Sequence, residues 1–313
     1  IGYSWLNQMT DLELGACLAD DMGLGKTVQI IAFLEYQRIE KGGKALLILP
    51  TSLIGNWEKE IEKFAPELPY QILHKSIAKN SDGMKINEDK FLYITTYKMV
   101  SKIEDLKTRK WNYMILDEAQ AIKNPGTKQT KEIKSIKAKV RIAMTGTPIE
   151  NRLGDLWSLF DFLNPGLLGS PKEFSDFANG LKDDLKGYAK LRKIISPFIL
   201  RRLKTDKSII SDLPEKIEAK AYTSLSKKQI ALYKELIKKI EDSLEDKEGI
   251  DRKGIVLSSI MKFKQICNHP DHYLGKEDYK IQDSGKFDKL REICESIYEK
   301  REKVIIFTQF KEM

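Results

Sequence analysis

The feature that most constrains the fold is a glycine-bearing segment, Asp20–Thr27, with the sequence DDMGLGKT. It follows an apolar run typical of a short strand, Ala16–Ala19, and it opens an apolar-periodic stretch typical of a helix, Thr27–Glu40. Gly23 and Gly25 would let backbone N–H groups close around phosphate oxygens at the positive end of that helix. The order of strand, loop and helix therefore predicts a phosphate-binding loop within an α/β sheet.

The match to the phosphate-loop pattern G-x-x-x-x-G-K-[ST] is imperfect, because Asp20 stands at the position of the first glycine. In such a loop Lys26 reaches the β- and γ-phosphates of a nucleotide, and the hydroxyl of Thr27 ligates magnesium. A glycine turn with an incidental Lys-Thr pair is the alternative explanation of this segment taken alone. We assign nucleotide binding to Asp21, Met22, Gly23, Leu24, Gly25, Lys26, Thr27 and Val28.

A second motif supports the nucleotide interpretation. The apolar run Tyr113–Leu116 ends in the sequence DEAQ. Nucleotide hydrolysis needs a carboxylate at the end of a strand to hold magnesium, here Asp117, and a group that orients or deprotonates the attacking water, here Glu118. In isolation, an acidic pair after a strand fits a solvated helix start equally well. Together the two motifs predict an ATP site with catalytic residues Lys26, Asp117, Glu118 and Gln120, and with Thr27 and Asp117 as magnesium ligands.

The first half of the chain alternates short apolar runs with longer amphipathic stretches, which is the pattern of strand–helix–strand units in a parallel sheet. Further strands are expected at Ala45–Leu49, Gln71–Leu73, Phe91–Thr95 and Val140–Met144, and further helices at Gly55–Phe64, Lys128–Ile136 and Leu153–Leu163. This pattern predicts an α/β fold class: a doubly wound lobe with helices on both faces of the sheet.

The composition changes in the second half. A charged, helical stretch is expected at Lys172–Ile195, and the basic segment that follows it is interpreted as a linker. After the linker we expect a second α/β lobe with strands at Ile217–Tyr222 and Lys303–Phe307, the latter buried, and with helices at Ser226–Glu245, Ile255–Cys267 and Phe287–Glu299. The expected division is a first lobe over 1–168, a helical protrusion over 169–200, the linker over 201–214 and the start of the second lobe over 215–313.

Composition excludes several classes of protein. The cysteines, Cys17, Cys267 and Cys294, are too widely spaced for a disulfide framework and fit a reducing compartment. The spacing of Cys267, His269 and His272 fits no common zinc site. The longest apolar runs have the length of strands, so no membrane span is expected. Basic residues outnumber acidic ones by 54 to 46, which favours an anionic partner only weakly.

Taken in order, the motifs resemble the SWI/SNF-type branch of the superfamily-two ATPases over nearly the whole chain. The resemblance implies two RecA-like lobes and a double-stranded DNA translocase driven by ATP, and DEAQ is more similar to archaeal and bacterial members than to eukaryotic ones. The segments that carry it are DDMGLGKT, LLILPTSLIGNWEKEIEKFAP (Leu46–Pro66), ITTYKMV (Ile94–Val100), LDEAQAIKNPGTK (Leu116–Lys128), MTGTPIENRLGDLWSLFDFLNP (Met144–Pro165), SPFILRRLKTD (Ser196–Asp206), DLPEKIE (Asp212–Glu218), KQICNHP (Lys264–Pro270), SGK (Ser284–Lys286) and KVIIFTQF (Lys303–Phe310).

The resemblance also implies roles for residues beyond the ATP site. It assigns coupling between nucleotide and DNA to Thr145, Gly146 and Thr147, for which a turn with hydroxyl caps is the alternative. Trp57 is expected to be a packing residue, and Arg201 and Arg202 are left open between phosphate contacts and ion pairs between lobes. The implied DNA contacts are Pro50, Thr51, Ser52 and Asn56, then Thr95, Thr96 and Tyr97, then Asn151 and Arg152, and in the second lobe Thr308 and Gln309.

The resemblance has two departures. The family's upstream glutamine motif and its later second-lobe motifs, which include the arginine fingers, have no counterpart in these 313 residues. We therefore expect a piece of a longer protein that hydrolyses ATP slowly by itself. Two rivals are a strand-separating helicase of the same superfamily and a noncatalytic DNA-binding scaffold. The expected partners are duplex DNA and a DNA-bound protein cargo, in the cytoplasm on the nucleoid of a bacterium or archaeon or in a eukaryotic nucleus.

Overall fold

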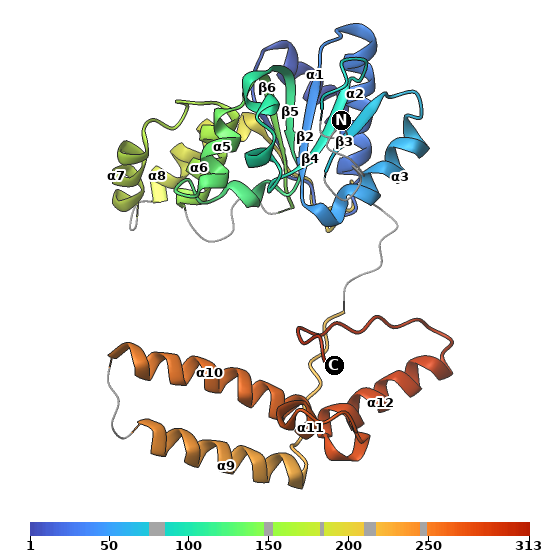
Figure 1. The fold of residues 1–313 in the computed structure, drawn as a ribbon, viewed down its shortest axis with the longest axis vertical. Helices are drawn as coiled ribbons and strands as arrows, with labels where there is room; N and C mark the ends of the chain where they lie inside the picture. The colour runs from blue at the N-terminus through green and yellow to red at the C-terminus, as the bar shows by residue number, and fades with distance from the viewer. Residues whose placement is uncertain (75–84, 147–152, 182–184, 210–216, 245–248) are drawn as a thin grey trace. The chain divides into compact units, whose positions relative to one another are not determined.

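The computed structural model describes residues 1–74, 85–146, 153–181, 185–209, 217–244 and 249–313. The chain forms two compact units, Ile1–Pro214 and Glu215–Met313 (Figure 1). The sheet and the predicted phosphate loop lie in the first unit, whereas the second unit is helical over its described residues.

The first unit is built on a parallel sheet that has seven strands over the described residues, in the order β3-β4-β2-β5-β6-β1-β7. The strands are β1 (Ala16–Leu18), β2 (Ala45–Leu49), β3 (Tyr70–Leu73), β4 (Leu92–Thr96), β5 (Lys110–Leu116), β6 (Lys137–Met144) and β7 (Ile199–Leu200). The first six correspond to the predicted apolar runs, with ends that differ by a few residues. The predicted α/β fold class is therefore confirmed.

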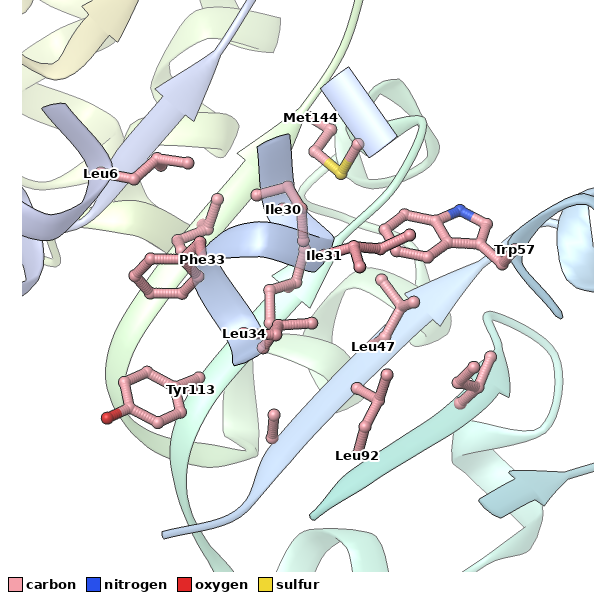
Figure 2. Close-up of a cluster of buried hydrophobic side chains, with 14 of the residues drawn as sticks. Leu6, Ile30, Ile31, Phe33, Leu34, Leu47, Trp57, Leu92, Tyr113 and Met144 are labelled. Atoms are coloured by element: carbon pink, nitrogen blue, oxygen red, sulfur yellow. The ribbon is translucent and has the colours of Figure 1, made fainter. Parts of the chain in front are cut away.

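Helices cover both faces of this sheet, as expected for a doubly wound lobe. Successive strand side chains point to opposite faces, so Leu47 and Leu49 join one core while Leu46 and Ile48 join the other. The first core, drawn in Figure 2, is closed by α1 (Gly2–Asp11), α2 (Lys26–Glu40) and α3 (Ile54–Phe64). The second is closed by α4 (Asp105–Thr108), α5 (Lys128–Ser135) and α6 (Leu153–Leu163).

Three of the helices and strands of the first unit were not predicted: α1, α4 and β7. The strand β7 pairs with β1 through Cys17 with Ile199 and Leu18 with Leu200. Two residues are too few to show the alternation that identifies a strand, so the sequence analysis placed them at the end of the helical protrusion. The residues that follow β7 begin the predicted linker. They are hydrogen-bonded to the phosphate loop, so this start of the linker packs against the first unit.

The predicted helical protrusion contains α7 (Pro171–Gly180) and α8 (Leu185–Ile195). Ser170 caps α7 in a reciprocal arrangement: its hydroxyl accepts from the backbone N–H of Glu173, and its own N–H donates to the Glu173 carboxylate at 2.7 Å. A third, smaller core joins these helices to α6.

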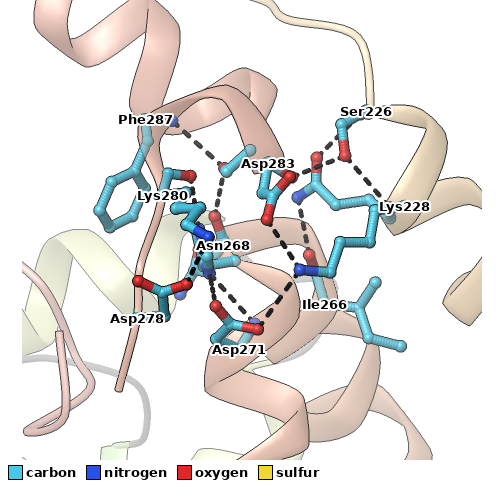
Figure 3. A network of polar contacts seen from close by, with 12 residues as sticks. Ser226, Lys228, Ile266, Asn268, Asp271, Asp278, Lys280, Asp283 and Phe287 are labelled. Atoms are coloured by element: carbon cyan, nitrogen blue, oxygen red, sulfur yellow. Dashed lines mark hydrogen bonds and ion pairs between the residues drawn. The ribbon is translucent and has the colours of Figure 1, made fainter. Parts of the chain in front are cut away.

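In the second unit the three predicted helices are confirmed as α9 (Lys227–Leu244), α10 (Gly249–Asn268) and α12 (Gly285–Glu299), with a short α11 (Pro270–Leu274) between the last two. Helices α9 and α10 pack against each other, and Gln229 of α9 donates a buried 2.7 Å hydrogen bond to the carbonyl of Ile266. Figure 3 shows the polar network at this end of the unit, where Lys228 contacts Asp283 at 2.7 Å and Asp271 at 3.6 Å.

The two strands predicted for the second unit are wrong. Ile217–Tyr222 and Lys303–Phe307 have no strand structure, and Ile217 and Phe307 are each 90% exposed. A strand needs a neighbour for its N–H and C=O groups, and the described residues of this unit contain no ladder that either segment joins. The apolar pattern of KVIIF is that of a buried strand, but the pattern alone does not provide a neighbouring strand to which KVIIF could hydrogen-bond.

His269 has a structural role at the start of α11. Its Nδ1 accepts a hydrogen bond from the N–H of Asp271 at 3.1 Å, and its Nε2 donates to the carbonyl of Lys280 at 2.9 Å. Both ring nitrogens of His269, one of the residues considered for a zinc site, are therefore hydrogen-bonded to backbone groups. Among the described helices, none is long and apolar enough to cross a membrane.

Candidate nucleotide site

Three neighbouring strands, β5, β6 and β1, bring the predicted catalytic segments together. Their register pairs Leu116 with Ala143 and Leu18 with Met144, and because the strands are parallel their carboxyl ends meet at one edge of the sheet. A cavity of about 360 Å³ lies there. It is lined by Met22, Gly23, Gly25, Lys26, Thr27 and Val28 of the phosphate loop, by Leu53, Asn56, Trp57 and Glu60 of the segment at α3, and by Asp117, Glu118 and Met144.

The phosphate loop has the backbone that its glycines predict. Gly23 and Gly25 adopt left-handed conformations, with φ of 85° and 72°, and Gly25 is the N-cap of α2. A side chain is strained in this region, so glycine is needed at both positions. The helix start thus presents unpaired N–H groups and the positive end of the α2 dipole to the cavity. The ammonium of Lys26 donates to the carbonyl oxygens of Asp20 at 2.6 Å and Asp21 at 3.4 Å.

Asp117 is held in place by two hydrogen bonds. Its Oδ2 accepts from the indole N–H of Trp57 at 2.8 Å, and its Oδ1 accepts from the N–H of Glu118 at 2.9 Å. Burial raises the pKa of Asp117, and the hydrogen bond from Trp57 opposes part of that rise. The carboxylate therefore has a fixed orientation at the edge of the cavity.

Trp57 is only 1% exposed and packs in the same core as Ile31, Leu47 and Met144 (Figure 2). The prediction of a packing residue is confirmed, because a buried indole offers no face to a nucleic-acid base. Its hydrogen bond to Asp117 was not predicted. The two residues belong to different strand–helix units, and only the shared sheet edge brings them together.

A hydrogen-bonded chain leads away from the acidic pair. Gln120 Nε2 donates to Glu118 Oε2 at 2.6 Å, and the hydroxyl of Thr145 donates to Gln120 Oε1 at 3.2 Å. Thr145 is buried, and its backbone N–H donates to the carbonyl of Leu18 at the end of β1. Gly146 lies next to the Met22 side chain of the phosphate loop. Of the three predicted coupling residues, Thr147 lies outside the described residues.

The predicted DNA contacts fall into two groups by exposure. Thr51, Ser52 and Asn56 are exposed and Pro50 is half-buried. Thr308 and Gln309 of the second unit are exposed as well, whereas Asn151 and Arg152 lie outside the described residues.

Thr95, Thr96 and Tyr97 are buried, which corrects the expectation that their side chains are available to DNA. The hydroxyl of Thr95 donates to the carbonyl of Leu73 at 3.0 Å, and that of Tyr97 donates to the carbonyl of Asp117 at 2.7 Å. Burial also raises the pKa of Tyr97 well above its usual value. The end of β4 therefore bonds to the end of β3 and to the backbone of Asp117, so the segment that the motif marks supports Asp117 from inside the fold.

The donor set of the cavity suits a hard divalent cation. Thr27 offers a hydroxyl and Asp117 a carboxylate, and both line the cavity. Glu60 lines it as well, and its Oε2 is buried without a hydrogen-bond partner. Magnesium prefers oxygen ligands and keeps several of its waters, so Thr27 and Asp117 would hold the ion and the Glu60 oxygen that lines the same cavity would accept from one of its waters.

The sequence also left Arg202 undecided, and the structure pairs it with Asp20 inside the first unit. Asp20 is fully buried, and the donors of Arg202 compensate its charge, which explains why this loop tolerates an acidic residue at the position of the first glycine. No local signal identifies this pair, because 182 residues separate its members.

Residues 2–272 match the model of the SNF2-related domain family. The chain belongs to this family. It is 39% identical over 323 residues to YwqA of Bacillus subtilis, covering 100% of this chain and 35% of YwqA. It is 34% identical over 330 residues to the ISWI chromatin-remodeling complex ATPase ISW2 of Saccharomyces cerevisiae, covering 100% of this chain and 29% of ISW2.

Solved structures of SNF2-related proteins have the same fold. The Sulfolobus solfataricus SWI2/SNF2 ATPase core in complex with dsDNA is 46% identical, with a TM-score of 0.65, and the match covers 99% of this chain and 65% of that chain. The family resemblance and the RecA-like lobe expected from the motifs are therefore confirmed. The SNF2-related chain spans about a third of the length of these two curated relatives.

Proposed function

We propose that this chain is part of an ATP-driven motor that moves along double-stranded DNA. The observation that carries the proposal is the meeting of three segments at one cavity: the phosphate loop, the carboxylates Asp117 and Glu118, and through Gln120 the end of β6. Two relatives support it, since ISW2 is an ATPase and the Sulfolobus ATPase core has been solved in complex with dsDNA.

The phosphate loop would bind the nucleotide through its backbone N–H groups and through Lys26. The ammonium of Lys26 would exchange the carbonyl oxygens of Asp20 and Asp21 for oxygens of the β- and γ-phosphates. Thr27 and Asp117 would hold magnesium, and Glu60 would accept from one of its waters. The ion, when bound, neutralises charge on the phosphate oxygens.

Glu118 would orient the attacking water and take its proton. Its carboxylate is held by the amide of Gln120 at 2.6 Å, which fixes the direction in which the remaining lone pairs point. The oxygen of the same amide accepts from the hydroxyl of Thr145. A movement of the Glu118 side chain would therefore be transmitted through Gln120 to the residue that follows β6. We assign coupling to Thr145 on this basis, to Gly146 because it lies next to Met22 of the phosphate loop, and to Thr147 from the family motif.

Contact with DNA would use the exposed residues after β2: Thr51, Ser52 and Asn56. Hydroxyl and amide groups of this kind bind phosphates and fix the register without reading the bases, so binding should be weakly sequence-dependent and salt-sensitive. Asn151, Arg152, Thr308 and Gln309 enter the proposal from the family motifs. Such a motor would act on the nucleoid in a bacterium or archaeon and in the nucleus of a eukaryote.

The test measures ATP hydrolysis by the intact protein with and without duplex DNA. We expect stimulation by duplex, and we expect Lys26→Ala to lower turnover by about a hundredfold or more, since it removes the cation at the transferred phosphate. Lys41→Ala is the matched control, because Lys41 is exposed and contacts only Asp11 among the ion pairs of the described residues. Equal rates with and without duplex, or in Lys26→Ala and wild type, would contradict the proposal.

A displacement experiment separates the motor from a helicase. A translocase should remove a third strand from a triplex while leaving an ordinary duplex intact. Strand separation of a plain duplex at a comparable rate would favour the helicase assignment instead.

A further inference from the structure

The segment Ile199–Lys204 runs beside β1 and continues along the phosphate loop. After the two β7 pairs, Ala19 N–H donates to the carbonyl of Leu200 at 2.7 Å, and Asp21 N–H donates to the carbonyl of Arg202 at 3.1 Å. The N–H of Lys204 then donates to the Asp21 carboxylate at 3.0 Å. Backbone pairing therefore extends beyond the strand onto the loop that binds phosphate.

Arg202 is the centre of this contact. Its Nε donates to Asp20 Oδ1 at 3.0 Å, its Nη2 donates to Asp20 Oδ2, and its backbone N–H donates to Asp20 Oδ1 at 2.9 Å. Asp20 is fully buried, so its charge depends on these donors. The backbone carbonyl of the same Asp20 is the main acceptor of the Lys26 ammonium.

Arg202 also reaches the other end of the loop. Its Nη2 donates to Gln29 Oε1 at 2.8 Å, and Gln29 Nε2 donates in turn to the carbonyls of Leu24 at 3.1 Å and Gly25 at 3.2 Å. One guanidinium thus connects the residue that begins the loop with the first turn of the helix that ends it. Its planar fork suits two partners at once, which an ammonium would not.

We propose that Arg202 is a positioning residue for the phosphate loop. By holding Asp20 and Gln29 it fixes the loop backbone and the carbonyl on which Lys26 rests. The inference rests on the proposed ATP-driven function and adds a residue to it. Since Arg202 belongs to the segment that leads along the chain to the second unit, a shift of that segment should change the affinity for ATP, and bound ATP should resist the shift.

The experiment measures equilibrium binding of a fluorescent ADP and the KM for ATP in the intact protein. Arg202→Gln should weaken both about tenfold while kcat changes by less than about threefold, because the loop is preorganised for binding rather than for the chemical step. Arg202→Lys should fall between wild type and Arg202→Gln, since it keeps the charge and loses the fork. Asp20→Asn combined with Arg202→Gln should cost no more than the worse single change, because the two residues act as one unit.

Arg141→Gln is the matched control for stability. Arg141 is a half-buried arginine of the same unit that donates to the carbonyls of Lys134, Ile136 and Phe162 and does not line the cavity. The Arg141→Gln substitution should lower the melting temperature and leave nucleotide affinity unchanged. If Arg202→Gln does not fold, Gln29→Met serves instead, with the ion pair intact and an expected loss of about threefold in affinity.

Two results would overturn the inference: nucleotide affinity in Arg202→Gln equal to wild type, or a loss no larger than that in Arg141→Gln. Failure of the proposed function looks different. In that case wild type itself shows no nucleotide binding or turnover, or Lys26→Ala matches it.

Discussion

The indole N–H of Trp57 donates a 2.8 Å hydrogen bond to Oδ2 of Asp117, across 60 residues of sequence. Trp57 belongs to α3 and Asp117 follows β5, so the bond joins the helical layer to the edge of the sheet that carries the proposed catalytic residues. This bond gives the buried carboxylate of Asp117 a donor whose position is fixed by the packing of Trp57 in the core.

Trp57→Phe keeps most of the packing and removes the donor. We expect the free energy of unfolding to fall by about 1–2 kcal/mol and ATP turnover to fall by about tenfold, because Asp117 loses its orientation. Trp111→Phe is the matched control: Trp111 is also buried and donates to a backbone carbonyl, that of Leu106, at 3.0 Å. A similar loss of turnover in both variants would count against a specific role for Trp57.

The pH dependence of the same variant has a definite sign. Burial is the main cause of the raised pKa of Asp117, and the Trp57 hydrogen bond lowers that pKa. Removing the donor should raise it further, so the acid limb of the kcat/KM profile should move to higher pH in Trp57→Phe and stay in place in Trp111→Phe.

Thermodynamic linkage gives the matching statement for stability. The pKa of Asp117 is higher in the folded protein than its ordinary value, so the folded state holds this proton more tightly than the unfolded chain does. The contribution of Asp117 to the free energy of unfolding is therefore favourable at low pH and is lost as pH rises through the raised pKa. Denaturant titrations of wild type and Asp117→Asn at several pH values check this.

Thr145→Val tests the hydrogen-bonded chain from Glu118 through Gln120. The substitution conserves shape and removes the hydroxyl that donates to Gln120. We expect DNA-independent ATP turnover to stay within about threefold and translocation per ATP to fall by about tenfold, because the connection and not the active site is lost. Thr130→Val is the control, since its buried hydroxyl accepts from the hydroxyl of Thr127, the N-cap of α5, and neither residue lines the cavity. Equal translocation in Thr145→Val and wild type would remove the coupling role.

Gly25→Ala isolates the conformational requirement of the phosphate loop. No atom lies within 4 Å of a Cβ at Gly25, so the cost comes from its φ of 72° and should be about 1–2 kcal/mol. Gly42 is a close match, with φ of 69° and the same open surroundings at the far end of α2. Both alanine variants should lose similar stability, but only Gly25→Ala should lose nucleotide affinity, measured by titration with a fluorescent ADP.

Glu60→Gln tests the buried carboxylate oxygen without a partner. If this oxygen accepts from a magnesium-bound water, the magnesium concentration for half-maximal ATP turnover should rise by about three- to tenfold. Glu62→Gln, on the exposed side of the same helix, should leave it unchanged. An unaltered magnesium dependence in Glu60→Gln would exclude the role.

Local sequence determined the elements of the site. The glycines at 23 and 25, Lys26 and Thr27 act within one turn between a strand and a helix, and Asp117 and Glu118 act at the end of one apolar strand. Such features depend on neighbouring residues, so DDMGLGKT and DEAQ predicted the α/β lobe and the cavity at its sheet edge. The same reasoning identified the helices of the second unit from their apolar periodicity.

Tertiary structure decided which residues hold that site together. Trp57 meets Asp117, and Arg202 meets Asp20 and Gln29, only because parallel strands end at a common edge, and no periodic pattern encodes contacts over such separations. Thr95 and Tyr97 are likewise buried against segments distant in sequence, where their hydroxyls donate to the carbonyls of Leu73 and Asp117. Lys303–Phe307 is the converse case. Its apolar pattern is local and is that of a buried strand, but a strand forms only when a second segment supplies hydrogen-bonding partners. The pattern in one segment does not determine whether such a partner is present.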